Sequence, residues 1–414
     1  MAITARRSGW AVLGCAATAL VLGACSSTTT SALGNNGTTA TKAPLLIGAS
    51  MSLSGDFATL ADPALKGYQL WVDTVNAKGG LLARKVSLKI VDDASNPTQV
   101  VTNYENLITA DHVNLVFGPF SSLLTIPSAT IAKRFGYAFI EPSGGAPQVF
   151  ALKLDNLFLA QPAPIISSGN AYANYILSLP PSQRPKTAAY PSADDPFTLA
   201  IVGVIRARLE AAGIKTVYST TYAAETVDLS PVVTRLVAAK PDLLVSGTGG
   251  ADAVAEVKGM IQARFSPKFV FFTGGPNDPT FPAQVGPANT EGIFSTGDWF
   301  PTAKTAGNAA FEQAWIAKYG GTAAHIDPAA AEAYACGQLL ELVAKKYGKI
   351  DNATIISALH HGVWPTVEGN LSWDAYGSPQ GSDIVVQWVH GQLLPVYPPA
   401  QALAKPIAKP AWAG

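Results

Sequence analysis

The sequence predicts an α/β protein made of two doubly wound parallel-sheet lobes, and three observations predict it. Short, almost wholly apolar runs alternate with longer segments whose apolar residues recur at helical spacing. The apolar runs lack the alternation of half-exposed strands, which indicates sheets covered by helices on both faces. The pattern then restarts after Gln161 and Pro162, so the chain holds two such units.

The first unit is expected to alternate strands and helices from residue 45 onward. Lys78, Gly79 and Gly80 follow its first helix and are typical of a helix end. The expected strands cover residues 45–49, 86–91, 113–117 and 138–140, and the expected helices cover residues 63–76, 98–110 and 126–135.

The second unit has a similar layout without close sequence repetition. Asp195 is expected to cap a helix whose first residue is Pro196. Two doubly wound lobes place a cleft between them, at the carboxyl ends of their strands. The expected helices of this unit cover residues 167–177, 197–212, 231–239 and 253–263, and its expected strands cover residues 187–190, 216–221, 243–246 and 269–272. A further helix is expected over residues 329–345.

The N-terminal residues have the layout of a secretory signal peptide. Arg6 and Arg7 precede an apolar run over residues 10–22, which is shorter than the roughly 20 residues of a membrane-spanning helix. An uncleaved anchor and a twin-arginine export signal are the alternatives to ordinary export. We expect a signal peptide over residues 1–24 and a flexible, Ser- and Thr-rich tether over residues 25–43.

Small residues stand immediately before Cys25 and resemble, with Leu22, the lipobox of bacterial lipoproteins. The resemblance implies cleavage before Cys25 and lipid attached to its sulfur. Cys15 would leave with the signal peptide, so Cys336 is left alone and no intramolecular disulfide is expected. Cys336 lies in an apolar helical pattern, which predicts a buried and inert thiol.

Composition excludes several classes of function. Lys and Arg together number 28, as do Asp and Glu, so no basic surface for nucleic acid is expected. The sequence lacks the G-x-S-x-G and H-E-x-x-H motifs, and its histidines show no spacing suited to a metal. Helix capping explains the carboxylate pairs at 92–93 and 194–195. We expect no enzyme activity, catalytic residue, metal or cofactor.

An ordered set of short stretches carries a resemblance to a known family. The stretches cover residues 48–55, 65–67, 75–84, 92–97, 117–122 and 141–143. In this order and spacing they resemble the leucine/isoleucine/valine-binding family of ABC-transporter solute-binding proteins, which has the type I periplasmic binding fold. The similarity extends over residues 45–395.

The resemblance implies a hinge in which the chain crosses between the lobes three times, near residues 157–162, 292–299 and 367–373. Multiple crossings make a hinge that closes like jaws. Lobe one would then cover residues 44–160 plus 293–368, lobe two residues 161–292 plus 369–398, and a C-terminal tail residues 399–414.

Hydroxyls and glycines at strand ends are the candidate ligand contacts of lobe one. Ser121 and Ser122 precede a helix, where hydroxyls and free N–H groups favour a carboxylate, although plain helix capping explains them equally. By the resemblance, Ser122 matches the serine that binds the ligand carboxylate. Ser143 adds a hydroxyl, and Gly144 and Gly145 let the backbone approach a ligand or simply form a turn. Glu141 precedes them, as a cleft acid or a solvated one.

Lobe two is expected to contribute an aromatic ring and bare backbone. The resemblance places Phe197 at the cleft rim and Gly249 and Gly250 in a ligand-facing turn. Amino-acid binders of the family place an acid, which pairs with the ligand ammonium, at the position of Gly275 or Pro276. Its absence counts against an α-amino acid as ligand.

Four further apolar residues are candidate cleft walls. By the resemblance, Leu60 takes the place of a ligand-contacting tryptophan, with Phe57 on the same loop, Trp299 at the second crossing and Tyr334 on a bordering helix. The alternative for each of the three aromatic rings is the core, where such rings are usually buried.

These observations predict an extracytoplasmic solute-binding lipoprotein of an ABC importer. It would capture a small organic solute, such as an amino acid, an amide or an organic or aromatic acid, by lobe closure and deliver it to a permease. The alternatives are a ligand-sensing receptor for a signalling partner and, more remotely, a surface-anchored enzyme. The expected partners are the small-molecule ligand, the permease subunits and the membrane through the lipid, and the chain itself is expected to be a monomer.

Overall fold

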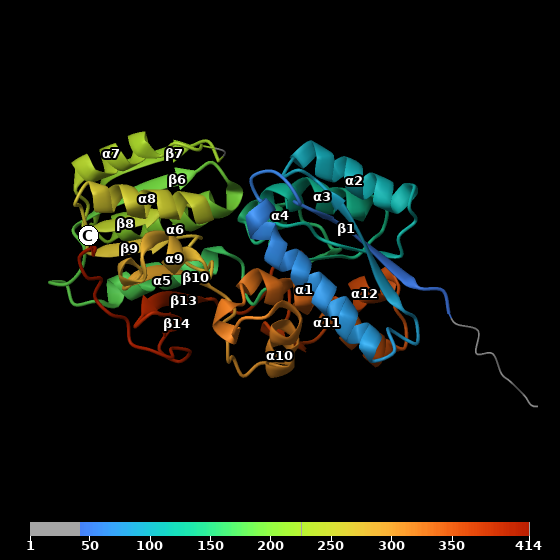
Figure 1. Ribbon diagram of the computed structural model, residues 1–414. Coiled ribbons are helices and arrows are strands. Elements are labelled where there is room, and N and C mark those ends of the chain that lie inside the picture. The colour runs from blue at the N-terminus through green and yellow to red at the C-terminus, as the bar shows by residue number, and fades with distance from the viewer. Residues whose placement is uncertain (1–41, 225, 414) are drawn as a thin grey trace, which may run out of the picture. The chain divides into compact units, whose positions relative to one another are not determined.

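The structure is a computed structural model that describes residues 42–224 and 226–413. The predictions for the signal peptide and for Cys25 lie outside these residues, as does nearly all of the tether. In the described part of the chain, two separate sheets carry the two lobes (Figure 1).

The first lobe is built on a parallel sheet with the strand order β2-β1-β3-β4-β5. These strands are β1 (Leu45–Met51), β2 (Val86–Asp92), β3 (Leu115–Phe117), β4 (Phe139–Glu141) and β5 (Leu157–Leu159). Its helices are α1 (Ala58–Ala77), α2 (Pro97–Thr109), α3 (Ser122–Arg134), α4 (Pro147–Ala151), α10 (Asn308–Tyr319), η2 (Ala323–His325), α11 (Pro328–Tyr347) and α12 (Asn352–Leu359). Helices α1 and α11, far apart in the sequence, lie side by side (Figure 1).

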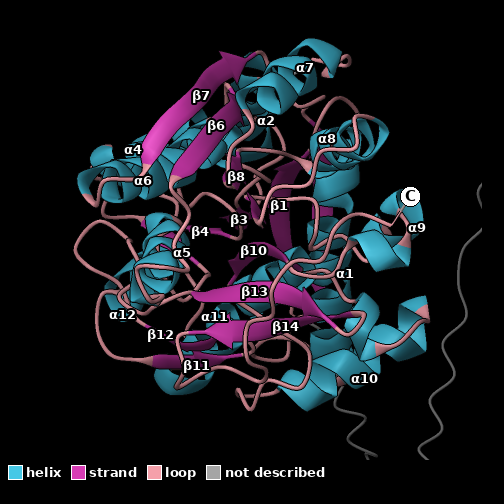
Figure 2. Cartoon of the chain, turned by 90° about the vertical axis from the view of Figure 1, so that its left-hand side faces the viewer, coloured by secondary structure: helices cyan, strands magenta, loops and turns pink. Residues whose placement is uncertain are grey.

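The second lobe is built on a larger sheet with the strand order β14-β13-β10-β9-β8-β6-β7. Its parallel strands are β6 (Thr187–Ala193), β7 (Lys215–Tyr222), β8 (Leu243–Ser246), β9 (Phe269–Phe272) and β10 (Ile293–Gly297). The hairpin of β13 (Ile384–Val389) and β14 (Gln392–Tyr397) joins them antiparallel to β10 (Figure 2). The helices are α5 (Ile166–Ser178), α6 (Pro196–Ala211), α7 (Ser230–Ala239), α8 (Gly250–Gln262), α9 (Phe281–Val285) and η1 (Pro287–Asn289).

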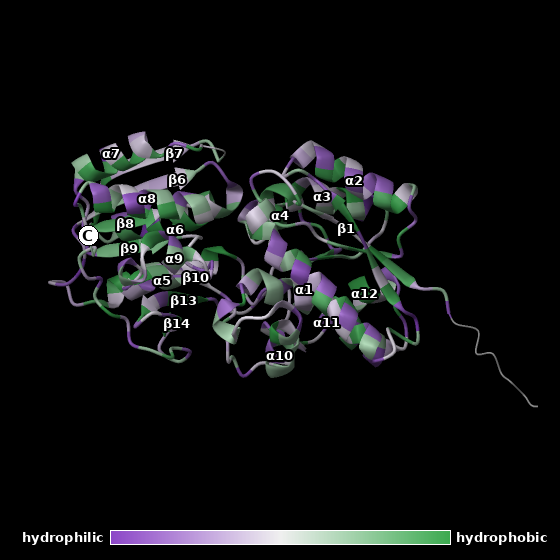
Figure 3. Ribbon diagram, in the orientation of Figure 1, coloured by the Kyte–Doolittle hydropathy of each residue, from purple (hydrophilic) through white to green (hydrophobic). Residues whose placement is uncertain are grey.

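Each sheet buries an apolar cluster on each face, which explains the nearly continuous apolar strands. In β8, Leu243 and Val245 join one cluster while Leu244 joins the cluster on the opposite face. In β3, Leu115 and Phe117 point to one cluster and the residue between them to the other. The covering helices α1 and α2 show mixed hydrophilic and hydrophobic residues along their length (Figure 3). The predicted doubly wound fold is therefore confirmed.

The chain passes between the sheets three times: after β5, after β10 and after the small hairpin of β11 (Trp364–Thr366) and β12 (Gly369–Leu371). The first and third crossings are bonded to each other, because Trp373 Nε1 donates to the carbonyl of Leu159 at 2.7 Å and the N–H of Gly381 donates to the carbonyl of Pro162 at 2.8 Å. Strand β10 pairs within the larger sheet, so the second crossing leaves that sheet after Gly297.

Two segments differ in detail from the sequence-based expectation. Helix α1 begins at Ala58 and contains Pro63, which was expected near its start; the N–H of Ala61 already bonds to the carbonyl of Phe57, so the helix is established before the proline. The segment expected as a tail packs on the second lobe, where Trp412 Nε1 donates to the carbonyl of Phe265 at 2.8 Å. Within the described ranges, no helix has the length and apolar character to cross a membrane.

Candidate functional site

The start of α3 is positioned by two buried tyrosines that bind the end of β3. Tyr68 donates to the carbonyl of Gly118 at 3.1 Å, and Tyr104 donates to that of Phe117 at 2.6 Å. Ser121 has a positive φ of 82° and caps α3, its hydroxyl accepting from the N–H of Leu124. The capping alternative for Ser121 is therefore confirmed, and its role as a ligand contact stays a prediction.

Ser122 is fully buried, and its hydroxyl oxygen accepts from the N–H of Ala146 at 3.1 Å. This bond joins the start of α3 to the loop after β4. The oxygen is occupied as an acceptor, but the hydroxyl hydrogen has no acceptor among the described residues, so Ser122 keeps one donor. The hydroxyl can therefore hold the loop and still donate to a ligand carboxylate.

The loop after β4 folds back around a buried glutamate. Glu141 accepts from the N–H groups of Ser143, at 2.9 Å, and Gly144. Burial raises the pKa of Glu141 to about 8, although these two bonds act in the opposite direction. A Cβ on Gly144 would lie 2.8 Å from both carboxylate oxygens, so this turn requires glycine. Glu141 is thus buried rather than solvated, and its Oε2 organises the loop that carries Ser143, Gly144 and Gly145, while its Oε1 has no partner among the described residues.

Asp92 and Asp93 hold the loop after β1 through hydrogen bonds from serine hydroxyls. Asp93 accepts from the hydroxyls of Ser50 and Ser52, and Asp92 from the hydroxyl of Ser54. Capping was the expectation for this pair, and it is wrong: the side chain of a neighbouring residue, Asn96, caps α2. The anchored loop leads into Phe57 and Leu60, and the ring of Phe57 lies 6.1 Å from that of Phe120.

Leu60 meets the glycine turn of the second lobe. A Cβ built on Gly249 would lie 3.7 Å from one terminal methyl of Leu60, and one on Gly250 would lie 3.9 Å from the other. Three predicted contacts from the two lobes therefore come together. Asp195 caps α6 as expected and accepts from the N–H of Phe197 at 2.9 Å. The ring of Phe197 is half-buried and packs on the core of the second lobe.

The remaining predicted ligand contacts pack against, or bond to, other parts of the protein. Gly275, with a φ of 96°, packs so closely on Ala253 that a Cβ would lie 2.6 Å from that methyl. The carbonyl of Pro276 accepts from Trp388 Nε1 at 3.1 Å. Trp299 and Tyr334 both lie in the apolar core of the first lobe, and both contact Phe311. Their proposed contact with a ligand stays a prediction.

Buried acids around the three crossings are what sequence reasoning missed. Glu332, Glu368 and Asp383 are each less than 10% exposed, and Asp298 lies beside them. Burial, together with the charge of Asp298, raises the pKa of Glu332, Glu368 and Asp383. One signal was available: Glu332 is a single charge within the apolar run over residues 329–337.

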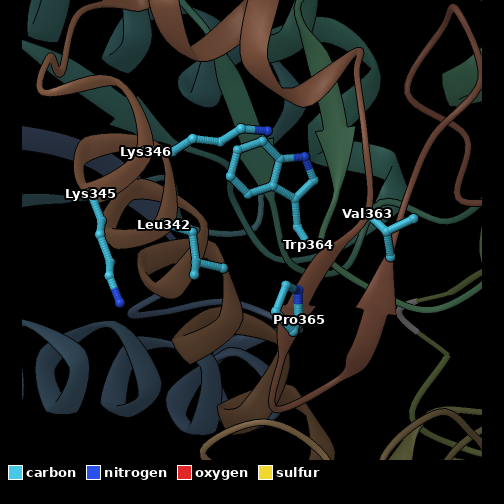
Figure 4. A pocket seen from close by; sticks show the side chains of 6 residues that line it. All are labelled: Leu342, Lys345, Lys346, Val363, Trp364 and Pro365. Carbon is cyan, nitrogen blue, oxygen red and sulfur yellow. The ribbon is translucent and has the colours of Figure 1, made fainter.

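The hollow of the surface shown in Figure 4 lies away from these groups. It has a volume of about 400 Å³ and is lined by Leu342, Lys345, Lys346, Val363, Trp364 and Pro365, with the amine of Lys346 4.8 Å above the ring of Trp364. Over residues 42–224 and 226–413, no group of three or more His, Cys, Asp or Glu side chains is arranged to hold a metal ion. Cys336 is buried as predicted, and burial raises the pKa of its thiol.

Two parallel-sheet lobes, three crossings and polar strand ends define a binding protein of the type I periplasmic fold. A model of the periplasmic binding protein family matches residues 44–392, so the chain belongs to that family. Members of this family and its structural neighbours bind solutes and are not enzymes.

Relatives of this chain are bacterial. Leu/Ile/Val-binding protein homolog 8 of Brucella suis is 26% identical, with 90% of this chain and 95% of that protein covered. A solute-binding protein from R. palustris, solved with benzoate, has a TM-score of 0.74 at 21% identity and covers 89% of this chain and 98% of its own. LivJ from Streptococcus pneumoniae, solved with isoleucine, has a TM-score of 0.71 at 21% identity, with 84% and 97% covered.

Proposed function

We propose that this chain is the extracytoplasmic solute-binding lipoprotein of an ABC importer, which captures a small organic solute between its lobes and delivers it to a permease. One observation carries the proposal: Leu60 of one lobe lies against Gly249 and Gly250 of the other, beside the strand ends of both sheets. Bare glycine backbone opposite an apolar side chain leaves its polar groups to a ligand. Membership of the periplasmic binding protein family supports the same role.

A carboxylate is the ligand group that the first lobe favours. Ser121 and Ser122 begin the 13-residue helix α3, whose N-terminus attracts an anion, and Ser122 has a hydroxyl hydrogen to donate. Structural neighbours hold carboxylates of two kinds, benzoate in one and isoleucine in another. Amino acids and organic or aromatic acids are therefore the solutes to test first.

Capture by closure follows from the crossings. Three connections, of which Trp373 and Gly381 bond the third to the first, allow rotation about one axis while resisting separation. A solute bound to both lobes stabilises the closed form by its differential affinity. Small-angle scattering with and without the best solute of a screen tests this step: the radius of gyration should fall at saturation, and an unchanged radius contradicts closure.

Ser122→Ala tests the site itself. Loss of a hydrogen bond to a charged group should weaken binding of a carboxylate solute by about 1.5–3 kcal/mol, or about 10–150-fold, in calorimetric titration. Ser128→Ala is the matched control, since Ser128 is equally buried in the same helix but donates within it, to the carbonyl of Leu124. If both variants lose stability while neither loses affinity, Ser122 serves only to hold Ala146.

The anchor is tested separately from the cleft. Cys25→Ser should release the protein from the membrane fraction into the soluble fraction, because the thiol that carries lipid is gone. Unchanged membrane association in that variant contradicts the lipoprotein assignment and leaves solute binding untouched.

A further inference from the structure

We propose that Asp298, Glu332, Glu368 and Asp383 form a site for an organic cation that carries N–H donors, an ammonium or guanidinium group of the solute. The proposal rests on the proposed function and deepens it, since it names the charge of the solute. The family's acid is missing at Gly275 and Pro276, and this site supplies acids from different elements.

The four acids come from four separate segments of the chain. Asp298 follows β10 at the second crossing, and Glu332 lies in the N-terminal part of α11. Glu368 occupies the turn between β11 and β12, and Asp383 directly precedes β13 at the third crossing. Only the threefold passage of the chain brings these residues together, so the site exists where the lobes join.

Two of these acids already touch each other and the predicted ligand loop. Glu332 accepts from the hydroxyl of Ser143 at 2.8 Å, and its carboxyl is hydrogen-bonded to that of Asp298. Two carboxylates in contact cannot both be charged without a proton or a cation between them. The bond to Ser143 joins the acids to the loop where the carboxylate of a solute is expected, so one molecule could reach both.

Glu368 is a buried carboxyl that lacks a hydrogen-bond donor within the described part of the chain. Its side chain is 5% exposed, and neither carboxylate oxygen has a hydrogen-bond partner among the described residues. It lies close enough to Asp298 and Asp383 for their charges to raise its pKa further than burial alone does. Burying a carboxyl without a hydrogen-bond partner costs free energy, and a donor from a ligand would remove that cost.

The protein supplies no cation of its own here. None of the ion pairs formed within residues 42–224 and 226–413 involves these carboxyls. The other charged groups nearby are also acidic, since Asp298 in turn raises the pKa of Asp327, as does Asp278. The hinge therefore concentrates carboxyl groups, whose charged form a cation of the solute would stabilise.

The geometry favours an organic cation over a metal ion. A metal needs several ligands converging on one point, and no such group occurs in the described residues. An ammonium has three donors and a guanidinium has five, spread over a larger volume. Such a group can bond to carboxylates that face it from separate elements.

Thermal-shift and calorimetric titration of the full chain at pH 7 test the proposal with named probes. The probes are putrescine and agmatine as N–H cations, tetramethylammonium as a cation without N–H, and benzoate and leucine. We expect putrescine or agmatine to raise the melting temperature, and tetramethylammonium to leave it unchanged. Glu368→Gln should lower the affinity for the responding amine about tenfold or more, the scale of a charged hydrogen bond.

Glu256→Gln is the matched control, because Glu256 is a fully buried carboxyl in the second lobe, bonded to Ser246 and distant from the hinge acids in sequence and fold. It should bind the amine like the parent chain. A response to benzoate without any response to the amines or to leucine overturns this proposal and leaves the proposed function standing, as does a response to leucine that Glu368→Gln leaves unchanged. Equal shifts of the melting temperature with putrescine and tetramethylammonium also overturn it, as do equal losses of amine affinity in Glu368→Gln and Glu256→Gln. If no probe changes the melting temperature, the result counts against both proposals.

Discussion

The loop after β4 and the turn between β11 and β12 each bury a glutamate, and the two glutamates are treated differently. Glu141 accepts from two backbone N–H groups, whereas Glu368 has no partner among the described residues. Both are held in a medium that disfavours their charge, so burial raises the pKa of each. The contrast shows that burial alone does not assign a role to an acid. One oxygen of Glu141 accepts both loop N–H groups, which marks a structural role, and its Oε1 has no partner among the described residues; Glu368 has no partner on either oxygen, which marks a place for something else.

The largest expected effect comes from removing the Glu141 carboxylate, which is the hydrogen-bond acceptor of the loop after β4. Glu141→Leu leaves the N–H groups of Ser143 and Gly144 buried without a partner, and we expect the free energy of unfolding to fall by about 3 kcal/mol. Urea denaturation measures this change. Glu141→Gln keeps a carbonyl acceptor and should lose less than half as much. Equal losses in the two variants would show that the loop does not depend on these bonds.

A second effect appears in the pH dependence of stability. The pKa of Glu141 is about 8 in the folded protein and 4.5 without burial, so between these values the folded chain holds a proton that the unfolded chain has released. The free energy of unfolding therefore falls as the pH rises through this window, by up to about 1.4 kcal/mol per pH unit from this group.

Glu141→Gln isolates that contribution, because Gln does not titrate. The unfolding free energy of the parent chain minus that of the variant should fall steadily from pH 5 to pH 8. Glu256, with a pKa of about 8, and Asp327, with a pKa of about 7, titrate in both proteins and cancel in the difference. A difference that is constant over this range would mean that Glu141 titrates normally.

The strands and helices, unlike these acids, were predictable from the sequence because each depends on a local pattern. Alternate residues of one apolar run face the two sides of β8. The cap of α6 needs only Asp195 and the N–H groups of the two residues that follow Pro196. Ser122 was identified by the family resemblance, but its bond to Ala146 depends on a loop from the next strand.

The hinge acids were not predictable, for a physical reason. Asp298 and Asp383 are separated by more than a fifth of the chain, and no periodicity relates them. Their proximity results from the crossings and the sheet order, which a local pattern does not encode. The same holds for Asp92 and Asp93, which bind the loop after β1 across the sheet instead of capping the helix that follows them.

The smallest expected effect has the opposite sign and separates the two glutamates most sharply. Glu368→Leu removes a buried carboxyl without breaking a protein hydrogen bond, and the new side chain has a similar volume. We expect the solute-free protein to be stabilised by about 1 kcal/mol, because the cost of burying an unpartnered acid is relieved. Urea denaturation of the solute-free chain measures it beside Glu141→Leu. A loss of 2 kcal/mol or more in Glu368→Leu would contradict this expectation and place both glutamates in the same structural class, since a loss of that size is the scale of a removed hydrogen-bond partner.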